Sequence, residues 1–288
     1  MLHSDWLESF IVFARLKNFT HAAQALHISQ PALHTQIAKL ASACGVELYR
    51  KVGRNIELTT QGIELAAMAR EMRDHQAEVL SRIQGEDTNV AVTLAAGRGA
   101  YLNLLGPALK PFIKAHPGRL SLLTTDAALT LDAVQSGKAH LGVTAWVGTH
   151  DKLCFTPIHR VGQMLVMPKN HHLANAKKVT LQQLEGEELI FGPSGGAHQQ
   201  MVVQALESLN VPYRCALETN DWDLMLKFAQ LGLGLAIVND FCSLPRGLTS
   251  VPVPALPAID YCLVEREKSL LLPLAQELRS YIFNLKKV

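Results

Sequence analysis

Residues 20–62 read THAAQALHISQPALHTQIAKLASACGVELYRKVGRNIELTTQG, and this stretch decides how the first part of the chain folds. Ser29 is a typical helix N-cap because its hydroxyl can accept an N–H group of the first turn, and Pro31 fits that turn because it has no N–H. The apolar residues that follow recur at helical spacing: Leu33, Ile37 and Leu40. The stretch therefore predicts a short helix, a tight break and a second helix with one buried face.

The opposite face of this second helix carries short hydrogen-bonding side chains instead of the Glu/Lys pairs of an ordinary solvated face. Such a face suits a recognition helix, whose N-terminal residues contact base edges in the major groove of DNA. The candidate DNA-contacting residues are Ser29, Gln30, Pro31, His34 and Thr35.

A basic hairpin follows the helix. Leu48 and Tyr49 open a short strand, residues 51–55 are turn material, and residues 56–58 return. The tip presents three cations, which we expect to lie along a phosphate backbone or in a minor groove: Arg50, Lys51 and Arg54.

The stretch resembles the LysR-type family of bacterial transcription regulators. The matching residues are Phe19-Thr20, Ala22-Ala23, Leu26, Ser29-Gln30-Pro31-Ala32, Ile37, Leu40, Gly45, Leu48, Arg54, Leu58-Thr59 and Gly62. His34 stands where a serine is usual, Thr35 where a basic residue is common, and Ala41-Ser42 replaces the usual acidic residue after Leu40. The base preference of the family therefore does not carry over to this chain.

The resemblance implies an α+β multidomain chain with a winged helix-turn-helix, a long linker helix and a two-lobed α/β effector domain of the periplasmic-binding-protein type. We place the DNA-binding domain at 1–59, the linker and dimerisation helix at 60–86, and the effector domain at 87–288. Lobe I is expected over about 87–160 and 261–288, and lobe II over about 161–260. The alternation of strands and helices, including a helix over 101–115, predicts mostly parallel sheets.

The long helix over 60–84 has an apolar stripe, formed by Ile63, Ala66, Ala67, Ala69, Ala77, Leu80 and Ile83. A second copy of the chain would cover this stripe in a dimer, and packing onto the chain's own wing is the alternative; both can hold at once. The family resemblance implies a homotetramer built from two types of dimer.

Length, composition and charge limit the classes of protein to which the chain can belong. The 288 residues are 48% hydrophobic and 18% charged, which is typical of a globular protein with more than one folding unit. Up to Thr60, six basic residues stand against four acidic ones, so we expect modest DNA affinity for each head and a need for dimers. The acidic N-terminal stretch is no signal peptide, and the longest apolar run, 231–238, is too short to span a membrane, so a cytoplasmic protein without membrane partners is expected.

Loops after three strands mark a ligand site, because ligands of α/β sheets bind at the carboxyl ends of strands and on helix N-termini. Two of these loops are glycine-rich, at residues 97–100 and 192–196, and the third is Thr124-Thr125-Asp126. Our hypothesis is an anionic or carboxylate-bearing effector held by Arg98 and by backbone N–H groups. The alternative is that the glycines only make turns and Arg98 is solvated. The candidate effector-binding residues are Arg98, Gly99, Ala100, Tyr101, Thr125, Trp146, Ser194, Gly195, His198 and Asn220.

Other motifs are set aside, so we expect no catalytic residue, metal or cofactor. Residues 192–196 match G-x-S-x-G, but the only histidine beyond Ser194 is His198, in the same helix. His171 and His172 are adjacent, and adjacent side chains point apart on regular elements. Gly97-x-Gly99 lacks the third glycine of a dinucleotide site.

The sequence thus predicts a regulator whose partners are operator DNA, a small-molecule effector and further copies of itself, as a homodimer or homotetramer. RNA polymerase is a further candidate partner. One alternative is a redox-sensing regulator, since some relatives sense oxidants and the chain has five scattered cysteines without a C-x-x-C motif. The other is a solute-binding α/β protein without a regulatory role.

Overall fold

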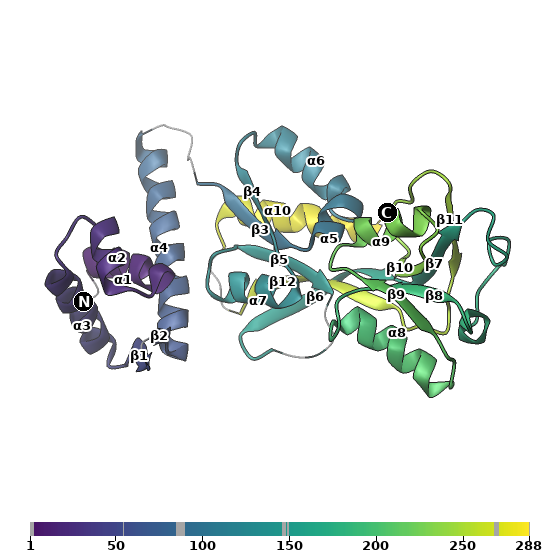
Figure 1. Cartoon of the computed structure of the whole chain (residues 1–288). Coiled ribbons are helices and arrows are strands. Elements are labelled where there is room, and N and C mark those ends of the chain that lie inside the picture. Colours follow the sequence, from purple (N-terminus) through teal and green to yellow (C-terminus); the bar gives the residue numbers. More distant parts are fainter. Residues whose placement is uncertain are drawn as a thin grey trace.

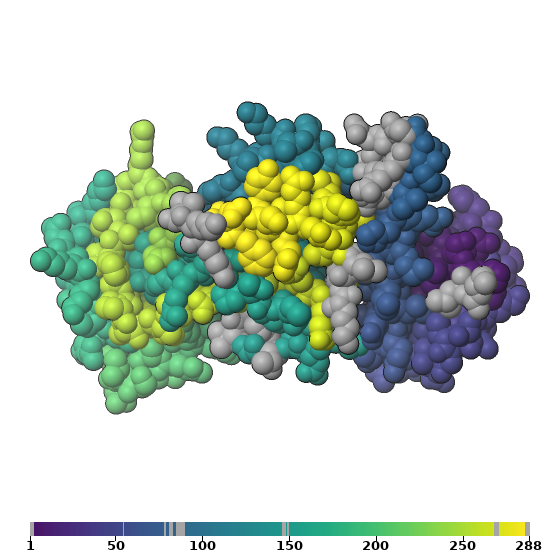
Figure 2. Space-filling view, turned by 180° about the vertical axis from the view of Figure 1, so that it is seen from behind, coloured from purple at the N-terminus to yellow at the C-terminus, as the bar shows by residue number. Residues whose placement is uncertain are grey.

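The computed structural model describes residues 3–53, 55–84, 90–145, 148, 150–267 and 271–287. Arg54 and Trp146, two of the predicted site residues, lie outside this range. The described parts form a row: a small head, one long helix, and two α/β lobes (Figure 1). The view from behind gives the same order, with the C-terminal segment on the central lobe (Figure 2).

The head contains α1 (Ser4–Leu16), α2 (Phe19–Ala25), α3 (Gln30–Cys44) and the hairpin β1 (Tyr49–Val52) and β2 (Asn55–Leu58). The predicted cap of α3 is confirmed, since the hydroxyl of Ser29 accepts the N–H of Ala32 at 3.3 Å. Asn18 caps α2, accepting the N–H of His21 at 3.0 Å. The largest fully buried side chains of the head are Phe10, Phe13, Leu33, Ile37, Leu40 and Leu48.

The long helix α4 (Thr60–Gln84) begins after Thr59, whose hydroxyl accepts the N–H of Gly62 at 3.0 Å and donates to the carbonyl of Glu47 at 2.6 Å. Ala66 and Ala69 are buried in the core of the head. Part of the predicted apolar stripe thus packs within its own chain.

The other side of α4 docks onto lobe I through charged groups. Arg266 pairs with Glu71, and Lys152 pairs with Glu64 at 3.0 Å. Gly137 of lobe I, with φ +70°, lies so close to Ala67 that a Cβ there would come within 3.1 Å of the helix backbone. Figure 1 accordingly places α4 between the head and lobe I.

Lobe I has a five-stranded sheet of order β4-β3-β5-β12-β6. Its strands are β3 (Val92–Ala96), β4 (Leu120–Thr124), β5 (Leu141–Ala145), β6 (Leu153–Val161) and β12 (Ile259–Arg266). One face is covered by α5 (Arg98–Asn103), α6 (Gly106–Ala115), α10 (Pro273–Phe283) and the turn η2 (Asn284–Lys287), and the other by α7 (Ala127–Gln135).

Lobe II repeats the plan with sheet order β11-β7-β10-β8-β9. Its strands are β7 (Gln163–Pro168), β8 (Glu188–Phe191), β9 (Arg214–Glu218), β10 (Leu235–Asn239) and β11 (Leu248–Pro252). The turn η1 (Leu181–Leu184) and α8 (Ala197–Ser208) cover one face and α9 (Trp222–Gln230) the other. Among the described helices, none has both the length and the apolar character that a membrane span needs.

Two expectations about these lobes were wrong. The sheets are mixed and not mostly parallel, because β12 in lobe I and β7 in lobe II run antiparallel to both of their neighbours. Both strands follow a crossing between the lobes and enter from the opposite end. The single helix expected over 101–115 is two helices, since α5 ends before Leu104 and α6 restarts at Gly106-Pro107, where proline supplies no N–H to continue the first.

We predict that Gly62→Ala strongly destabilises the head, because an added Cβ would lie 1.9 Å from the carbonyl oxygen of Leu48. Overpacking against backbone costs about 1–3 kcal/mol, and this clash should reach the upper end. Urea unfolding of the full chain measures the loss. Gly106→Ala, also in a first helical turn but with no atom within 4 Å of its added Cβ, is the matched control and should be close to neutral.

Candidate nucleic-acid interface and inter-lobe site

The outer face of α3 is polar and exposed. Five of the eight residues predicted to contact DNA belong to this helix and its cap, and all five are exposed: Ser29, Gln30, Pro31, His34 and Thr35. Lys39, one turn beyond Thr35, extends this face and lies 5.9 Å from the ring centre of Trp6. Sequence reasoning missed Lys39, although its spacing of four residues from Thr35 is a usable signal.

Intramolecular bonds orient these side chains. The hydroxyl of Thr35 donates to the carbonyl of Pro31 at 2.9 Å, and Thr20 donates to the amide oxygen of Gln30 at 3.3 Å. The ring of His34 stacks on Phe19 with 3.6 Å between centroids and 13° between planes. The amide NH2 of Gln30 and the edge of a fixed imidazole are therefore the groups this face offers to a partner.

The hairpin presents less free positive charge than its sequence suggests. Arg50 lies opposite Glu57 in the strand register and pairs with it at 3.0 Å. Lys51, opposite Ile56, is exposed. Of the described cations of the hairpin, Lys51 is thus the one without a carboxylate directly across the strands.

Polar contacts join the two lobes. Arg98 at the start of α5 binds Asp223 at 3.0 Å and lies 3.8 Å from Asp221, both at the start of α9. The N–H of Ser243 donates to the side-chain oxygen of Asn103 at 3.1 Å. A further contact joins Asn239 of β10 to Tyr261 of β12.

A chain of hydrogen bonds crosses from lobe II to lobe I. The ring nitrogen Nε2 of His198 lies 3.0 Å from Oε1 of Gln163, whose amide donates to Oδ1 of Asn239 at 2.9 Å. The amide of Asn239 donates to the hydroxyl oxygen of Tyr261 at 3.2 Å. Gln163 and Asn239 are buried, so these bonds are satisfied inside the protein and fix how the lobes join.

Burial sets the protonation states of His198 and Tyr261, the two ends of this series of hydrogen bonds. It lowers the pKa of His198 to about 4 and raises the pKa of Tyr261. His198 is therefore neutral near pH 7, and since the acceptor facing its Nε2 is a carbonyl oxygen, that nitrogen carries the proton.

Several predicted effector residues are occupied by bonds inside their own lobe. The hydroxyl of Tyr101 donates to the carbonyl of Leu94 at 2.6 Å, and burial raises its pKa to about 12. Thr125 shares a hydrogen bond of 2.7 Å with Thr130. Gly99 and Ala100 lie in the first turn of α5, beside Arg98.

In lobe II the glycine-rich turn is tied to its own surroundings. The hydroxyl of Ser194 donates to the carboxylate of Glu218 at 2.7 Å, and the N–H of Gly195 donates to Gln199 at 3.0 Å. Asn220 is exposed beside Asp221. The structure thus brings Arg98 to the Asn220–Asp223 turn, while the hydroxyl of Ser194 is bound to Glu218.

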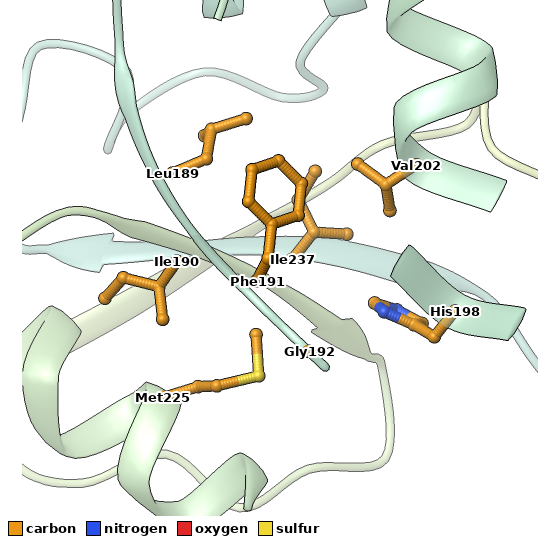
Figure 3. A pocket seen from close by; sticks show the side chains of 8 residues that line it. All are labelled: Leu189, Ile190, Phe191, Gly192, His198, Val202, Met225 and Ile237. Carbon is orange, nitrogen blue, oxygen red and sulfur yellow. The ribbon is translucent and has the colours of Figure 1, made fainter. Parts of the chain in front are cut away.

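A small apolar pocket lies beneath His198 at the carboxyl end of β8 (Figure 3). Its lining residues are Leu189, Ile190, Phe191, Gly192, His198, Val202, Met225 and Ile237. The pocket has a volume of about 10 Å³, roughly the room of one water molecule. A metabolite can enter this pocket only if its lining side chains move.

The cysteines give the redox alternative little support. Cys242 and Cys262 are buried, whereas Cys154 and Cys215 are exposed. Burial raises the pKa of the Cys242 thiol to about 12, and burial and the charge of Glu218 raise that of Cys215. A raised pKa lowers the fraction of reactive thiolate.

Comparisons with known proteins agree with this architecture. Residues 4–63 match the family model of the bacterial regulatory helix-turn-helix protein, lysR family, and residues 86–285 match the LysR substrate binding domain. The chain is 27% identical to the HTH-type transcriptional regulator CysB of Burkholderia cenocepacia over 277 residues, which cover 93% of this chain and 86% of that protein. It is 26% identical over 254 residues to the regulator YybE of Bacillus subtilis, covering 84% and 85% of the two chains.

Solved structures give the same fold. A point variant of full-length OxyR from Pseudomonas aeruginosa superposes with a TM-score of 0.71 at 16% identity, covering 99% of this chain and 95% of that one. Full-length CbnR in complex with its target DNA superposes with a TM-score of 0.58 at 20% identity, covering 99% of both chains.

We predict that His198→Gln makes the folded protein less sensitive to acid. Folded His198 has a pKa of about 4, whereas an unfolded histidine has a pKa of about 6.5, so between these values the unfolded chain binds the extra proton. The stability of the parent therefore falls as the pH falls through this window. Relative to the parent, the variant should gain about 3 kcal/mol between about pH 7 and about pH 4, measured by urea unfolding. Parallel pH profiles would show that His198 is not the responsible group.

Proposed function

The chain belongs to the LysR family of DNA-binding transcriptional regulators, and from that premise we propose how it reads DNA and how an effector controls it. The N-terminal half of α3 enters the major groove of an operator, and the hairpin contacts the backbone. The observation that carries this proposal is the exposed polar face of α3, held outward by the burial of Leu33, Ile37 and Leu40 on the other side.

We assign base contacts to Gln30 and His34. An amide can pair with adenine through two hydrogen bonds, one donated by its NH2 group and one accepted by its oxygen. The oxygen of Gln30 accepts from Thr20 with one lone pair and keeps the second for the base, and its NH2 group is a donor. Stacking on Phe19 fixes the plane of the His34 ring, so its contact costs little side-chain entropy. Around Gln30 and His34, the surface that comes close to the DNA is formed by Ser29, Pro31 and Thr35.

We assign phosphate contacts to Lys51 and, on the basis of the sequence alone, to Arg54. Arg50 contributes less because Glu57 already neutralises it. With so few cations in each head, the salt-dependent part of the affinity is small, and two heads must bind together for a stable complex.

We propose a homodimer that forms through α4. Five large apolar residues of this helix stay exposed, and four of them follow a heptad-like spacing of four and seven residues: Met68, Met72, Val79 and Ile83, with Leu80 beside them. Ile83 is 77% exposed, so a second copy of the helix has an apolar surface to cover.

Effector control would act through the docking of α4 on lobe I. Although burial opposes it, bonding to His140 and the charge of Arg73 hold the pKa of Asp74 on α4 below its ordinary value, so this side of the interface stays charged. A gap of about 300 Å³ remains between helix and lobe, next to Lys152 and Arg266. Ion pairs thus hold α4 to lobe I, and the gap leaves the helix room to tilt.

We propose an anionic or carboxylate-bearing effector that competes with Asp223 for Arg98. In the closed arrangement Arg98 already holds two carboxylates, so an effector must replace these bonds and open the α5–α9 contact. Opening would change how the lobes meet, and through the docked α4 it would change the spacing of the two heads.

We predict that Gln30→Ala weakens binding to the preferred duplex by about 1–3 kcal/mol while leaving non-specific binding nearly unchanged. Duplexes selected from a random pool and gel-shift titrations measure both affinities. Equal losses on preferred and random duplexes would remove Gln30 from the base contacts.

Lys51→Ala should instead weaken binding to all duplexes and reduce the slope of log K against log salt by about one. Lys177→Ala, an exposed lysine of lobe II, is the matched control and should leave the slope unchanged. If the two lysine variants behave alike, the hairpin makes no phosphate contact.

Val79→Glu should dissociate the dimer, because it places charge in the apolar face of α4. Analytical ultracentrifugation reports the assembly, and Gln84→Glu, at an exposed position of the same helix, should keep it. A Val79→Glu protein that sediments as the parent does would rule out this face as the dimer contact.

A further inference from the structure

One cluster of ligand-type side chains lies outside the DNA interface and outside the inter-lobe contacts. His171 and His172 follow β7, and Glu187 directly precedes β8, so the three groups meet at the end of lobe II where β7 stops and β8 starts. The crossing between the lobes lies at the other end of β7. The function proposed above does not use this cluster.

The two histidines do not point apart as adjacent residues of a regular element would. They lie in a turn after Pro168, and their rings are 4.4 Å apart at 35°. The N–H of His171 donates to the carbonyl of Pro168 at 3.0 Å, and buried Leu173 anchors the turn in the lobe II core. The two adjacent side chains can therefore face one ion, because they lie in a turn and not on a regular element.

The distances within the cluster fit ligands around a common ion better than a hydrogen-bonded pair. Nε2 of His171 lies 3.6 Å from one oxygen of Glu187, and Nε2 of His172 lies 3.6 Å from the other. Hydrogen bonds to oxygen span about 2.7–3.2 Å, so neither contact is a good one. With metal–ligand bonds of about 2.0–2.2 Å, neighbouring ligands of a tetrahedral ion lie about 3.3–3.6 Å apart.

We propose that His171, His172 and Glu187 bind one divalent transition-metal ion, for which Zn²⁺ is the reference. The three ligand atoms all lie within 4.8 Å of one another, so a side-chain movement of about 1 Å completes the set. Two imidazoles and one carboxylate are a zinc-type donor set with a fourth position open to water. Mg²⁺ and Ca²⁺ prefer oxygen ligands and fit it poorly.

The turn must make one adjustment when the ion binds. The N–H of Leu173 now points at Nδ1 of His171 from 3.3 Å, which places the proton of the neutral ring on Nε2. Coordination through Nε2 moves that proton to Nδ1 and ends this long contact. His172, with its side chain 66% exposed, can reorient freely toward the ion.

Binding would join the segment after β7 to the start of β8 and stabilise lobe II by mass action. The experiment uses the untagged full chain, stripped with a chelator and then titrated with Zn²⁺ alone by calorimetry. We expect one ion per chain with a dissociation constant on the order of micromolar, and a melting temperature that rises with the Zn²⁺ concentration. Co²⁺ in place of Zn²⁺ should give the visible absorption of a tetrahedral nitrogen–oxygen site.

His172→Ala and Glu187→Gln should each weaken binding at least about tenfold and abolish the Co²⁺ absorption. His116→Ala is the matched control, because His116 also faces a glutamate, Glu277, at a hydrogen-bonding 2.9 Å but belongs to no such three-ligand group of described residues. Its affinity should equal that of the parent. Binding that survives His172→Ala, or a parent that takes up no stoichiometric ion, would overturn the proposal.

Discussion

Burial of one face of α3 is the constraint on which the other functional features depend. Leu33, Ile37 and Leu40 are at most 1% exposed, and burying each such side chain contributes about 1.5–3 kcal/mol. They pack into the same core as Phe10 and Phe13. The helix cannot rotate without exposing this face, so its polar side is fixed outward and available to a duplex.

The second constraint is that α4 packs against both the head and lobe I. Small residues make this geometry feasible, since Ala66 and Ala69 enter the head core while Ala67 lies against Gly137 of lobe I. Close backbone approach on both sides leaves the large apolar residues of α4 exposed, and this is the face that we propose a second copy of the chain covers. Because α4 contacts both bodies, we propose that a change in lobe I reaches the head through this helix.

Local features of this chain were predictable and long-range polar ones were not. Caps depend on residues within three positions, so the cap at Ser29 could be assigned from the sequence. The partner of Arg98, by contrast, lies 125 residues away, and nothing in either local pattern connects them. The bond between Gln163 and Asn239 is also long-range, and the mixed strand directions follow from lobe crossings that no local signal encodes.

The most direct test of the account is hydroxyl-radical footprinting of the full chain with and without its preferred duplex, read residue by residue by mass spectrometry. The account predicts that His34 and Lys51 lose reactivity when DNA binds, whereas exposed His172 and Lys177 of lobe II keep theirs. Unchanged reactivity at His34 and Lys51, with protection elsewhere on the molecule, would contradict the claim that α3 and the hairpin form the DNA-reading surface.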